Sequence, residues 1–281
     1  MSATKVSKEL PNDDSQSGCD LRIGTSGYDY PEWEGRFYRQ GVGRSEYLGE
    51  YSEVFDTVEL NFSYYNMPKA QRMQELLSRT RRPIDFAVKA NKALTHVVDP
   101  ASWDGSVREF SLGLEPLAAA GRLCAVLFEF PYSFHYEENE RRYLDKVLRA
   151  FAAFPLAVEF RNAQWLNARV IEGLRARDVA LCALDMPRLE GLPPVSDLVT
   201  SSKLAYVRFH GRNEAMWWDG DNASRYDYLY SKDELAGWIP RIETMSTQTQ
   251  RLRIYFNNHK GANAAFNARD FTRLAKDARL L

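Results

Sequence analysis

Short apolar runs recur along the chain, and most of them are separated by segments with a helical pattern. This alternation is typical of parallel βα units. Eight runs predict strands: Leu21–Gly27, Thr57–Asn61, Asp85–Asn91, Leu123–Phe130, Leu156–Arg161, Val179–Asp185, Ala205–Gly211 and Leu252–Asn258. We therefore expect an α/β protein with a single (β/α)8 barrel, the TIM barrel. A doubly wound open sheet is the alternative, and the strand count and the closing helical segment favour the barrel.

The connecting segments supply the expected helices. They are Ser45–Phe55, Lys69–Thr80, Glu138–Phe154, Asn167–Arg177, Ser231–Met245 and Ala262–Leu280. Ser231 followed by Glu234 is a capping-box pattern at the start of one of them. Met186–Ser202 is rich in proline and glycine, so the helix between the sixth and seventh strands is expected to be short or missing.

Composition places the chain among ordinary globular proteins. Residues 1–20 are polar and lack the apolar centre of a secretory signal, which predicts a disordered tail before a barrel domain at 21–281. No apolar run approaches a membrane span, and the three cysteines form no metal or disulfide motif, so we expect a cytoplasmic protein without a membrane partner. The net charge of −1 makes a nucleic-acid partner possible but not favoured.

Residues two apart in a strand share one face, and this parity separates polar from apolar positions. Apolar residues in the runs should face the ring of helices, so the polar set should face the barrel axis. That polar set is Thr57, Glu59, Asn61, Lys89, Asn91, Glu159, Arg161, Tyr206, Arg208, His210, Tyr255, Asn257 and His259. It gathers toward the carboxyl ends of the strands, where barrel enzymes build active sites.

Charges of both signs meet at this mouth. Four acids, Glu59, Glu129, Glu159 and Asp185, accompany three bases, Lys89, Arg161 and Arg208, together with His210. The simplest interpretation is a buried network of ion pairs with only a structural role. The desolvation cost of the charges, however, means that such networks add little to the stability of the fold. Because several charges converging on one cavity more often mark a functional site, we favour a site.

Seven segments in combination resemble the YecE-like family, domain of unknown function 72. They are IGTSGYDYPEWEGRFY (23–38), TVELNFSYYNMP (57–68), FAVKANKALTH (86–96), LFEFPYSF (127–134), AVEFRNAQW (157–165), YVRFHGR (206–212) and YFNNHKGANAAFNA (255–268). The resemblance covers the chain from about residue 21 to its end and implies a (β/α)8 barrel. It implies no activity, because the family's biochemical function is not established.

Five positions depart from the pattern of that family. They are Tyr28 in place of tryptophan, Glu129 in place of glutamine, Tyr132 in place of proline, Asn162 in place of histidine and His259 in place of aspartate. The change at Glu129 adds an acid to the mouth.

Aromatic side chains are concentrated in the loops that follow the first, second and seventh strands. Tyr28 and Trp218 are among those that could stack on a sugar ring or a base, and packing of the loops on the rim is the equal alternative. Asn257–Gly261 and Asn263 surround the start of the last helix, where barrels often bind phosphate, with Arg208, Arg212 and Lys260 as added charge. Ordinary capping of that helix is the simpler interpretation.

A divalent metal is possible but not favoured, and no cofactor is otherwise indicated. Glu159, Asp185 and His210 end three successive strands and offer oxygen and imidazole ligands. Lys89, Arg161 and Arg208 would repel a cation at the same place. No residue is therefore assigned as a metal ligand.

The leading hypothesis is an enzyme, a hydrolase or an isomerase, that acts on an anionic substrate with a sugar or nucleotide ring. Its expected catalytic residues are Glu159, Glu59, His210 and Asp185. Its expected substrate-binding residues are Lys89, Arg161, Arg208, Asn61, Asn91, Asn257, Tyr28 and Trp218. The alternatives are a metal-assisted phosphodiesterase or endonuclease and a non-catalytic protein that binds a small ligand.

Overall fold

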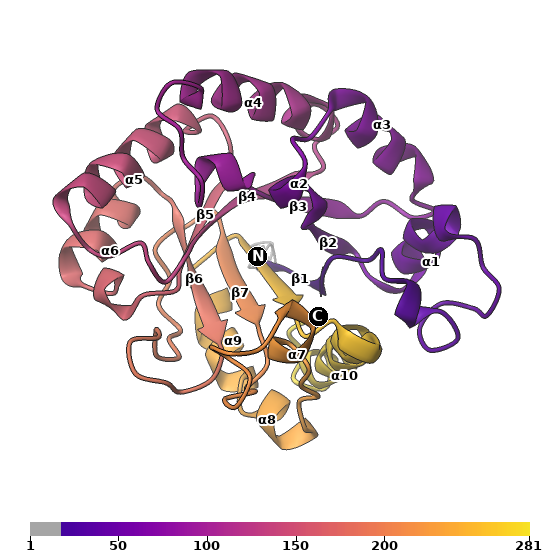
Figure 1. The fold of residues 1–281 in the computed structure, drawn as a ribbon. Coiled ribbons are helices and arrows are strands. Elements are labelled where there is room, and N and C mark those ends of the chain that lie inside the picture. Colours follow the sequence, from indigo (N-terminus) through magenta and orange to yellow (C-terminus); the bar gives the residue numbers. More distant parts are fainter. Residues whose placement is uncertain (1–17) are drawn as a thin grey trace, which may run out of the picture.

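The computed structural model describes residues 18–281, without the side chains of residues 222 and 223. Eight parallel strands pair in chain order, and β8 closes on β1. Figure 1 shows the strands at the centre with the helices around them, which confirms the predicted (β/α)8 barrel. The strands are β1 (Asp20–Ser26), β2 (Thr57–Leu60), β3 (Asp85–Lys89), β4 (Leu123–Phe130), β5 (Leu156–Phe160), β6 (Ala180–Asp185), β7 (Ala205–Phe209) and β8 (Arg251–Phe256).

The helices form the outer layer and the connections at the mouth. The α-helices are α1 (Tyr47–Val54), α2 (Phe62–Tyr65), α3 (Ala70–Arg79), α4 (Trp103–Ala119), α5 (Glu138–Ala150), α6 (Ala168–Arg175), α7 (Asn222–Arg225), α8 (Lys232–Ala236), α9 (Ile239–Ser246) and α10 (Asn263–Asp277). Short 3-10 turns are η1 (Pro31–Trp33), η2 (Arg44–Glu46), η3 (Lys92–Leu94), η4 (Ala163–Trp165) and η5 (Lys260–Ala262).

The expected helices are present, with two differences. The predicted helix Ser231–Met245 is divided into α8 and α9, and the capping box of Ser231 and Glu234 opens α8 as predicted. The structure also contains α4, a 17-residue helix between β3 and β4 that the sequence pattern did not predict. No helix interrupts the segment between β6 and β7, in agreement with its proline and glycine content.

The barrel interior is polar along much of its length, as strand parity predicts. Near the start of the strands, Arg253 Nη2 lies 2.7 Å from an oxygen of Asp85. Further along, the hydroxyl oxygens of Tyr255 and Thr57 lie 2.6 Å apart. The apolar residues of opposite parity, such as Val58 and Leu60, are buried in the cluster that joins the strands to the helices.

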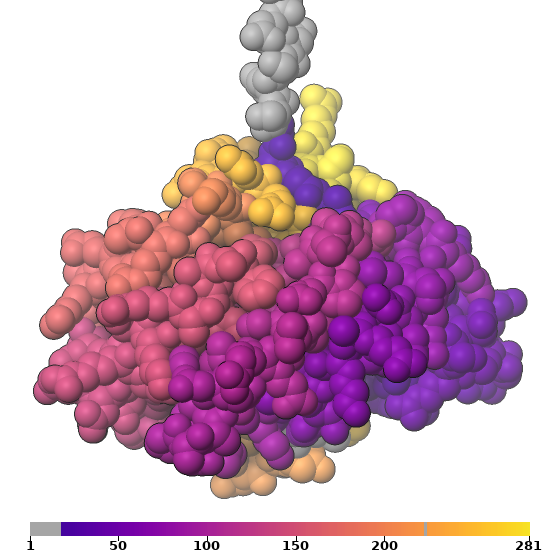
Figure 2. Space-filling model, turned by 90° about the horizontal axis from the view of Figure 1, so that it is seen from above, coloured from indigo at the N-terminus to yellow at the C-terminus, as the bar shows by residue number. Residues whose placement is uncertain are grey.

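The carboxyl ends of the strands lie far from both ends of the described chain. Figure 2 shows the first described residues and the C-terminal segment at the same end of the molecule. β1 begins there at Asp20, so the opposite end carries the loops that follow the strands. The predicted disordered tail comprises residues 1–20. Of these, residues 1–17 lie outside the described residues. Within residues 18–281, no helix combines the length and the apolar character that crossing a membrane requires.

Candidate functional site

Arg208, on β7, is the centre of the polar network inside the upper barrel. Its side chain is 1% exposed, and its guanidinium donates hydrogen bonds to carboxylates from three other strands. Nη2 lies 2.7 Å from Glu59, and Nη1 lies 2.6 Å from Glu159 and 2.7 Å from Glu129. The planar fork of arginine suits this bridging, because several donors point in fixed directions.

Two further cations balance the three carboxylates. Lys89 Nζ lies 3.0 Å from Glu129, and Arg161 Nε lies 2.6 Å from Glu159. Glu59 also accepts a hydrogen bond of 2.7 Å from the hydroxyl of Tyr206. Three acids thus face three bases in one buried cluster. Removing charges from water is costly, and this arrangement gives each buried charge an opposite charge as a partner.

The pKa values of the glutamates follow from these neighbours. Burial alone would raise the pKa of Glu129, but the positive charges of Lys89, Arg161 and Arg208 outweigh it and hold that pKa well below its usual range. Burial likewise opposes ionisation of Glu159, and Arg161 and Arg208 again prevail and lower its pKa. Both carboxylates are therefore ionised at neutral pH.

His210 connects this cluster to the mouth in its neutral form. Its Nε2 lies 3.0 Å from Glu159 Oε1, and its Nδ1 lies 3.1 Å from Asn257 Nδ2. An amide nitrogen donates, so Nδ1 accepts and Nε2 carries the proton. Burial, helped by the charge of Arg161, lowers the pKa of His210 to about 4. His210 thus fixes the orientation of Asn257.

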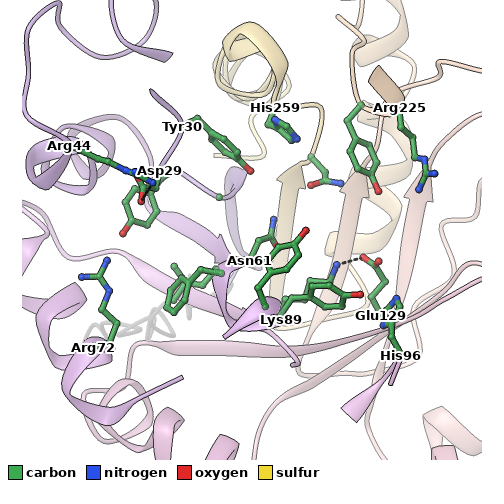
Figure 3. A pocket seen from close by; sticks show the side chains of 18 residues that line it. Asp29, Tyr30, Arg44, Asn61, Arg72, Lys89, His96, Glu129, Arg225 and His259 are labelled. Carbon is green, nitrogen blue, oxygen red and sulfur yellow. Dashed lines mark hydrogen bonds and ion pairs between the residues drawn. The ribbon is translucent and has the colours of Figure 1, made fainter. Parts of the chain in front are cut away.

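A cavity of about 750 Å³ opens above this cluster at the carboxyl ends of the strands. Figure 3 shows Arg44, Asp29 and Arg72 at one end of it and Lys89, Glu129 and His96 at the other. The cavity is lined by Gly27, Tyr28, Asp29, Tyr30, Arg44, Leu60, Asn61, Phe62, Tyr64, Tyr65, Arg72, Lys89, His96, Glu129, Arg225, Tyr226, Asn257 and His259. Its volume is in the range of small-molecule sites.

The residues predicted for the site fall into three groups. Four line the cavity: Lys89, Asn61, Asn257 and Tyr28. Five belong to the buried cluster and do not line it: Glu59, Glu159, Arg161, Arg208 and His210. The remaining three, Asn91, Trp218 and Asp185, have their contacts elsewhere.

Asn91 and Trp218 have contacts outside the cavity. The side chain of Asn91 accepts a hydrogen bond from the backbone of Ala93 and donates one to the carbonyl of Ser63, so it caps η3. The ring of Trp218 is 48% exposed and meets the edge of Tyr132 with centroids 5.0 Å apart. Neither side chain is brought to the cavity with the other predicted residues.

Asp185 points from β6 toward the helices, whereas the acids with which it was grouped face the barrel interior. It shares the parity of Leu181 and Ala183, which pack toward the helices, whereas Cys182 and Leu184 face the interior. Its carboxylate accepts hydrogen bonds from Arg212 (2.8 and 2.6 Å), from the Tyr230 hydroxyl (2.7 Å) and from Trp238 Nε1 (2.7 Å). The trio of Glu159, Asp185 and His210 considered for a metal is therefore divided between two faces. Over residues 18–281, no three His, Cys, Asp or Glu side chains cluster as metal ligands would.

Replacing Asp185 with asparagine is expected to lower the free energy of unfolding by about 2–3 kcal/mol. The neutral amide weakens the bond to Arg212 and leaves one donor without a good acceptor. Chemical denaturation checks this, with Asp233→Asn, an exposed position on α8, as the control. Equal stability of the two variants would contradict the structural role.

The aromatic side chains of these loops take both expected positions: some line the cavity and others pack the loops on the rim. Tyr30, Tyr64, Tyr65 and Tyr226 line the cavity, and the ring of Tyr30 stacks on His259 with centroids 4.7 Å apart. Other rings, including Trp33, are fully buried and pack the loops on the rim. The corner after β8 is largely occupied by internal contacts, since Lys260 pairs with Asp227 at 2.8 Å and Arg212 pairs with Asp185.

Several cavity residues were not singled out from the sequence. Glu129 was counted among the acids at the mouth, yet it was given no role, and it is the one glutamate that lines the cavity. His259 was counted in the polar set by its parity but was likewise given no role, and His96 follows a strand and could have been found by its position. Arg44, on η2, and Arg72, on α3, carry no such signal, because arginines on helices are ordinary surface residues.

Comparisons with known proteins identify the family of the chain. Residues 22–280 match the family described as "Protein of unknown function DUF72". The UPF0759 protein YunF of Bacillus subtilis (strain 168) is 29% identical over 241 residues, which are 81% of this chain and 86% of that protein.

Solved structures show the same fold in relatives. A DUF72 family protein of Thermotoga maritima MSB8 is 33% identical, with a TM-score of 0.83 over 92% of this chain and 99% of that one. A DUF72 family protein of Enterococcus faecalis V583 is 25% identical, with a TM-score of 0.81 over 91% of this chain and 95% of that one. These descriptions give a family and a fold without naming a substrate. With its match from residue 22 to residue 280, the chain belongs to the DUF72 family.

Proposed function

We propose that the mouth cavity is the active site of an enzyme that acts on a small anionic molecule carrying a sugar or nucleotide ring. The observation that carries the proposal is a cavity with an excess of positive charge, in which buried polar atoms have no partner. The reaction class we propose is hydrolysis or isomerisation by general acid–base chemistry.

The charge of the lining favours an anion. Four cationic side chains, Arg44, Arg72, Lys89 and Arg225, face two carboxylates, Asp29 and Glu129. Walls of low dielectric strengthen this excess, so the cavity should concentrate anions from solution. A neutral sugar or a cation would leave the excess uncompensated.

Two buried atoms of the lining point to a ligand with polar groups. Asn61 Oδ1 and His259 Nδ1 are buried and make no hydrogen bond within the described part of the chain; the carboxylate near His259 Nδ1 is that of Glu32, at 3.9 Å. Buried polar atoms are nearly always paired, and a ligand would supply the missing partners. The stacked pair of Tyr30 and His259 beside them offers a flat surface for a ring.

Glu129 and Lys89 are the groups we propose for the chemistry. Glu129 reaches the cavity as a carboxylate, the form that can take up a proton, although the cations that lower its pKa make it a weak base. Lys89 beside it can hold an anion or donate a proton. Glu159, Glu59 and His210 were the expected acid–base groups. Because their partners hold them below the cavity, we propose that they act as positioning residues for Arg161, Arg208 and Asn257. Asp185 has no part in this proposal.

Mass spectrometry of small molecules that remain bound to the native protein tests the proposal. We expect a bound anion in the wild-type protein, and we expect Lys89→Met to lose it by at least about tenfold in affinity. Lys203→Met is the matched control, because Lys203 also forms a lysine–carboxylate pair, with Asp178 at 3.1 Å, on the surface. If Lys89→Met and the control retained the bound anion equally well, the assignment of the cavity as the anion-binding site would be refuted.

Glu129→Gln separates catalysis from binding. This change keeps the shape of the side chain and removes its charge, so we expect the ligand to stay bound while its turnover falls. A ligand recovered unchanged after incubation with the wild-type protein would instead indicate a binding protein without catalytic activity.

A further inference from the structure

A second hollow lies beside the mouth cavity, on the side of β1 and β2. It has a volume of about 260 Å³ and is lined in part by Arg44, Arg72 and Arg79. Tyr28, Asp29, Arg44 and Arg72 line both this hollow and the main cavity. The two spaces therefore lie side by side, with these four residues between them.

Three arginines surround this hollow, and two of them, Arg72 and Arg79, share one carboxylate. Arg72 and Arg79 are seven residues apart on α3, which places both guanidinium groups on the same face of the helix. Arg72 pairs with Glu75 at 3.1 Å, whereas Arg79 comes no nearer than 3.9 Å to that same carboxylate. Among the described residues, this is the single ion pair of Arg79.

Only one carboxylate belongs to the lining of the hollow. Asp29 accepts two hydrogen bonds from Arg44, at 2.6 and 3.1 Å, and so neutralises one of the three cations. Glu75 lies outside the lining and is shared by the other two arginines. The hollow, with a volume of about 260 Å³, therefore keeps an excess of positive charge.

We propose that this hollow is an anion subsite, the arginine subsite, and that it binds the phosphoryl group of a small phosphate ester whose ring occupies the main cavity. The proposal rests on the proposed function of that cavity and specifies its substrate class. The forked donors of arginine match the oxygens of a phosphoryl group better than those of any neutral substituent.

Neighbouring hydroxyls complete the subsite. Tyr28 and Ser45 also line it, and the hydroxyl groups of such residues can donate to phosphate oxygens between the arginines. Burial raises the pKa of Tyr28 to about 12, so its hydroxyl keeps its proton at neutral pH. The ester would then lie between the arginine subsite and the pair of Lys89 and Glu129. Figure 3 shows this pair at the opposite end of the cavity from Arg44 and Arg72.

A small ester fits better than a nucleic acid. The chain has a net charge of −1, and binding of a polyanion along its backbone needs a wider basic surface than one hollow provides. The positive charge gathers in one small hollow, whose arginine side chains are 36–65% exposed, rather than along a groove. We therefore assign the arginine subsite to a terminal phosphoryl group.

The test is titration of the protein with inorganic phosphate, followed by 31P NMR and by thermal stabilisation. We expect Arg72→Ala/Arg79→Ala to weaken phosphate binding at least about tenfold. Arg72→Lys/Arg79→Lys keeps the charge and should recover part of the affinity. The matched control is Arg142→Ala/Arg273→Ala, which removes two exposed helical arginines that pair with Glu138 and Asp270.

Each outcome decides for or against the subsite. Loss of phosphate binding in the alanine variant alone, with partial recovery in the lysine variant, supports it. Equal binding by all variants, or no binding by the wild-type protein, overturns it. Salt-sensitive binding of a single-stranded DNA oligonucleotide with no binding of phosphate also overturns it.

The failure of the subsite is distinguishable from failure of the proposed function. If a co-purifying ligand depends on Lys89 but is indifferent to Arg72 and Arg79, the main cavity keeps its role and only the arginine subsite falls. If the ligand depends on none of the three, the proposed function falls as well.

Discussion

Replacing Arg208 with methionine is expected to lower the free energy of unfolding by about 5 kcal/mol, the upper end of the range for breaking a buried ion pair. Methionine fills similar space but removes the donor to Glu59, Glu129 and Glu159 together. The three carboxylates would remain in the barrel with only Lys89 and Arg161 to compensate them. A loss of this size is a large part of the total stability of a typical domain, about 5–15 kcal/mol.

Thermal and chemical denaturation measure this effect, and a second substitution identifies its cause. Arg208→Met combined with Glu59→Gln removes one of the uncompensated charges, so the double variant should be less destabilised than the sum of the single variants. Arg273→Met, at an exposed pair on α10, should change stability by no more than about 0.5 kcal/mol. A loss below about 1 kcal/mol for Arg208→Met would contradict the view that these carboxylates depend on Arg208.

A cluster with this sensitivity is a costly way to stabilise a barrel. Replacing a buried set of ion pairs with apolar residues of similar volume is often neutral or stabilising. The interior at this level could hold branched aliphatic residues, as many barrels do. The cluster instead holds Arg161 and Asn257 in fixed orientations below a cavity, which is the kind of support that a functional site requires.

The alternation of polar and apolar residues was enough to predict the barrel and its inner face. Each of four charged residues has apolar neighbours on both sides along its strand, so alternation assigns it to the face opposite the helices. These residues are Glu59, Lys89, Glu159 and Arg208. The structure brings these four together as the pattern predicts. Strand parity thus located the polar cluster without any knowledge of contacts.

Parity could not place Asp185, and the reason is physical. Both faces of β6 are buried and apolar, with Leu181 and Ala183 on one side and Cys182 and Leu184 on the other. A strand covered on both faces gives no alternation to follow. The partners of Asp185 come from the loop after β7 and from residues on either side of α8, which are distant in sequence.

The missed helix α4 has a related explanation. It contains Gly105, Gly113 and Pro116, which lower helix propensity. Gly113 is required by packing, because a Cβ atom there would lie 2.2 Å from the carbonyl oxygen of Pro68. Tertiary contact therefore overrides a weak local preference, which no local pattern reveals.

Acidification is expected to destabilise the protein steeply through the same buried groups. The unfolded chain protonates a histidine near pH 6.5, whereas burial and the nearby charge of Arg161 lower the pKa of His210 to about 4 in the folded state. The unfolded state therefore binds more protons between these values, and stability falls as the pH falls. The shift corresponds to about 3 kcal/mol lost between pH 6.5 and 4.

The glutamates extend this loss to lower pH. Lys89, Arg161 and Arg208 overcome the effect of burial and lower the pKa of Glu129, and Arg161 and Arg208 do the same for Glu159. Their stabilising contribution is complete above the pKa of an unfolded glutamate, near 4.3, and is lost as the pH falls below that value. The wild-type protein should therefore be stable at pH 7 and lose stability continuously below about pH 6.5.

Urea denaturation at a series of pH values, with His210→Gln as the comparison, separates the two contributions. Glutamine can still donate to Glu159 and accept from Asn257, but it has no proton to gain. The variant should lose less stability than the wild-type protein between pH 6.5 and 4, and the two should behave alike below pH 4. Burial also lowers the pKa of His96 and His259, so a smaller dependence should persist in the variant. If the variant instead showed the full wild-type loss above pH 4, His210 would have to be charged in the folded protein, and Asn257 would be oriented by some other contact.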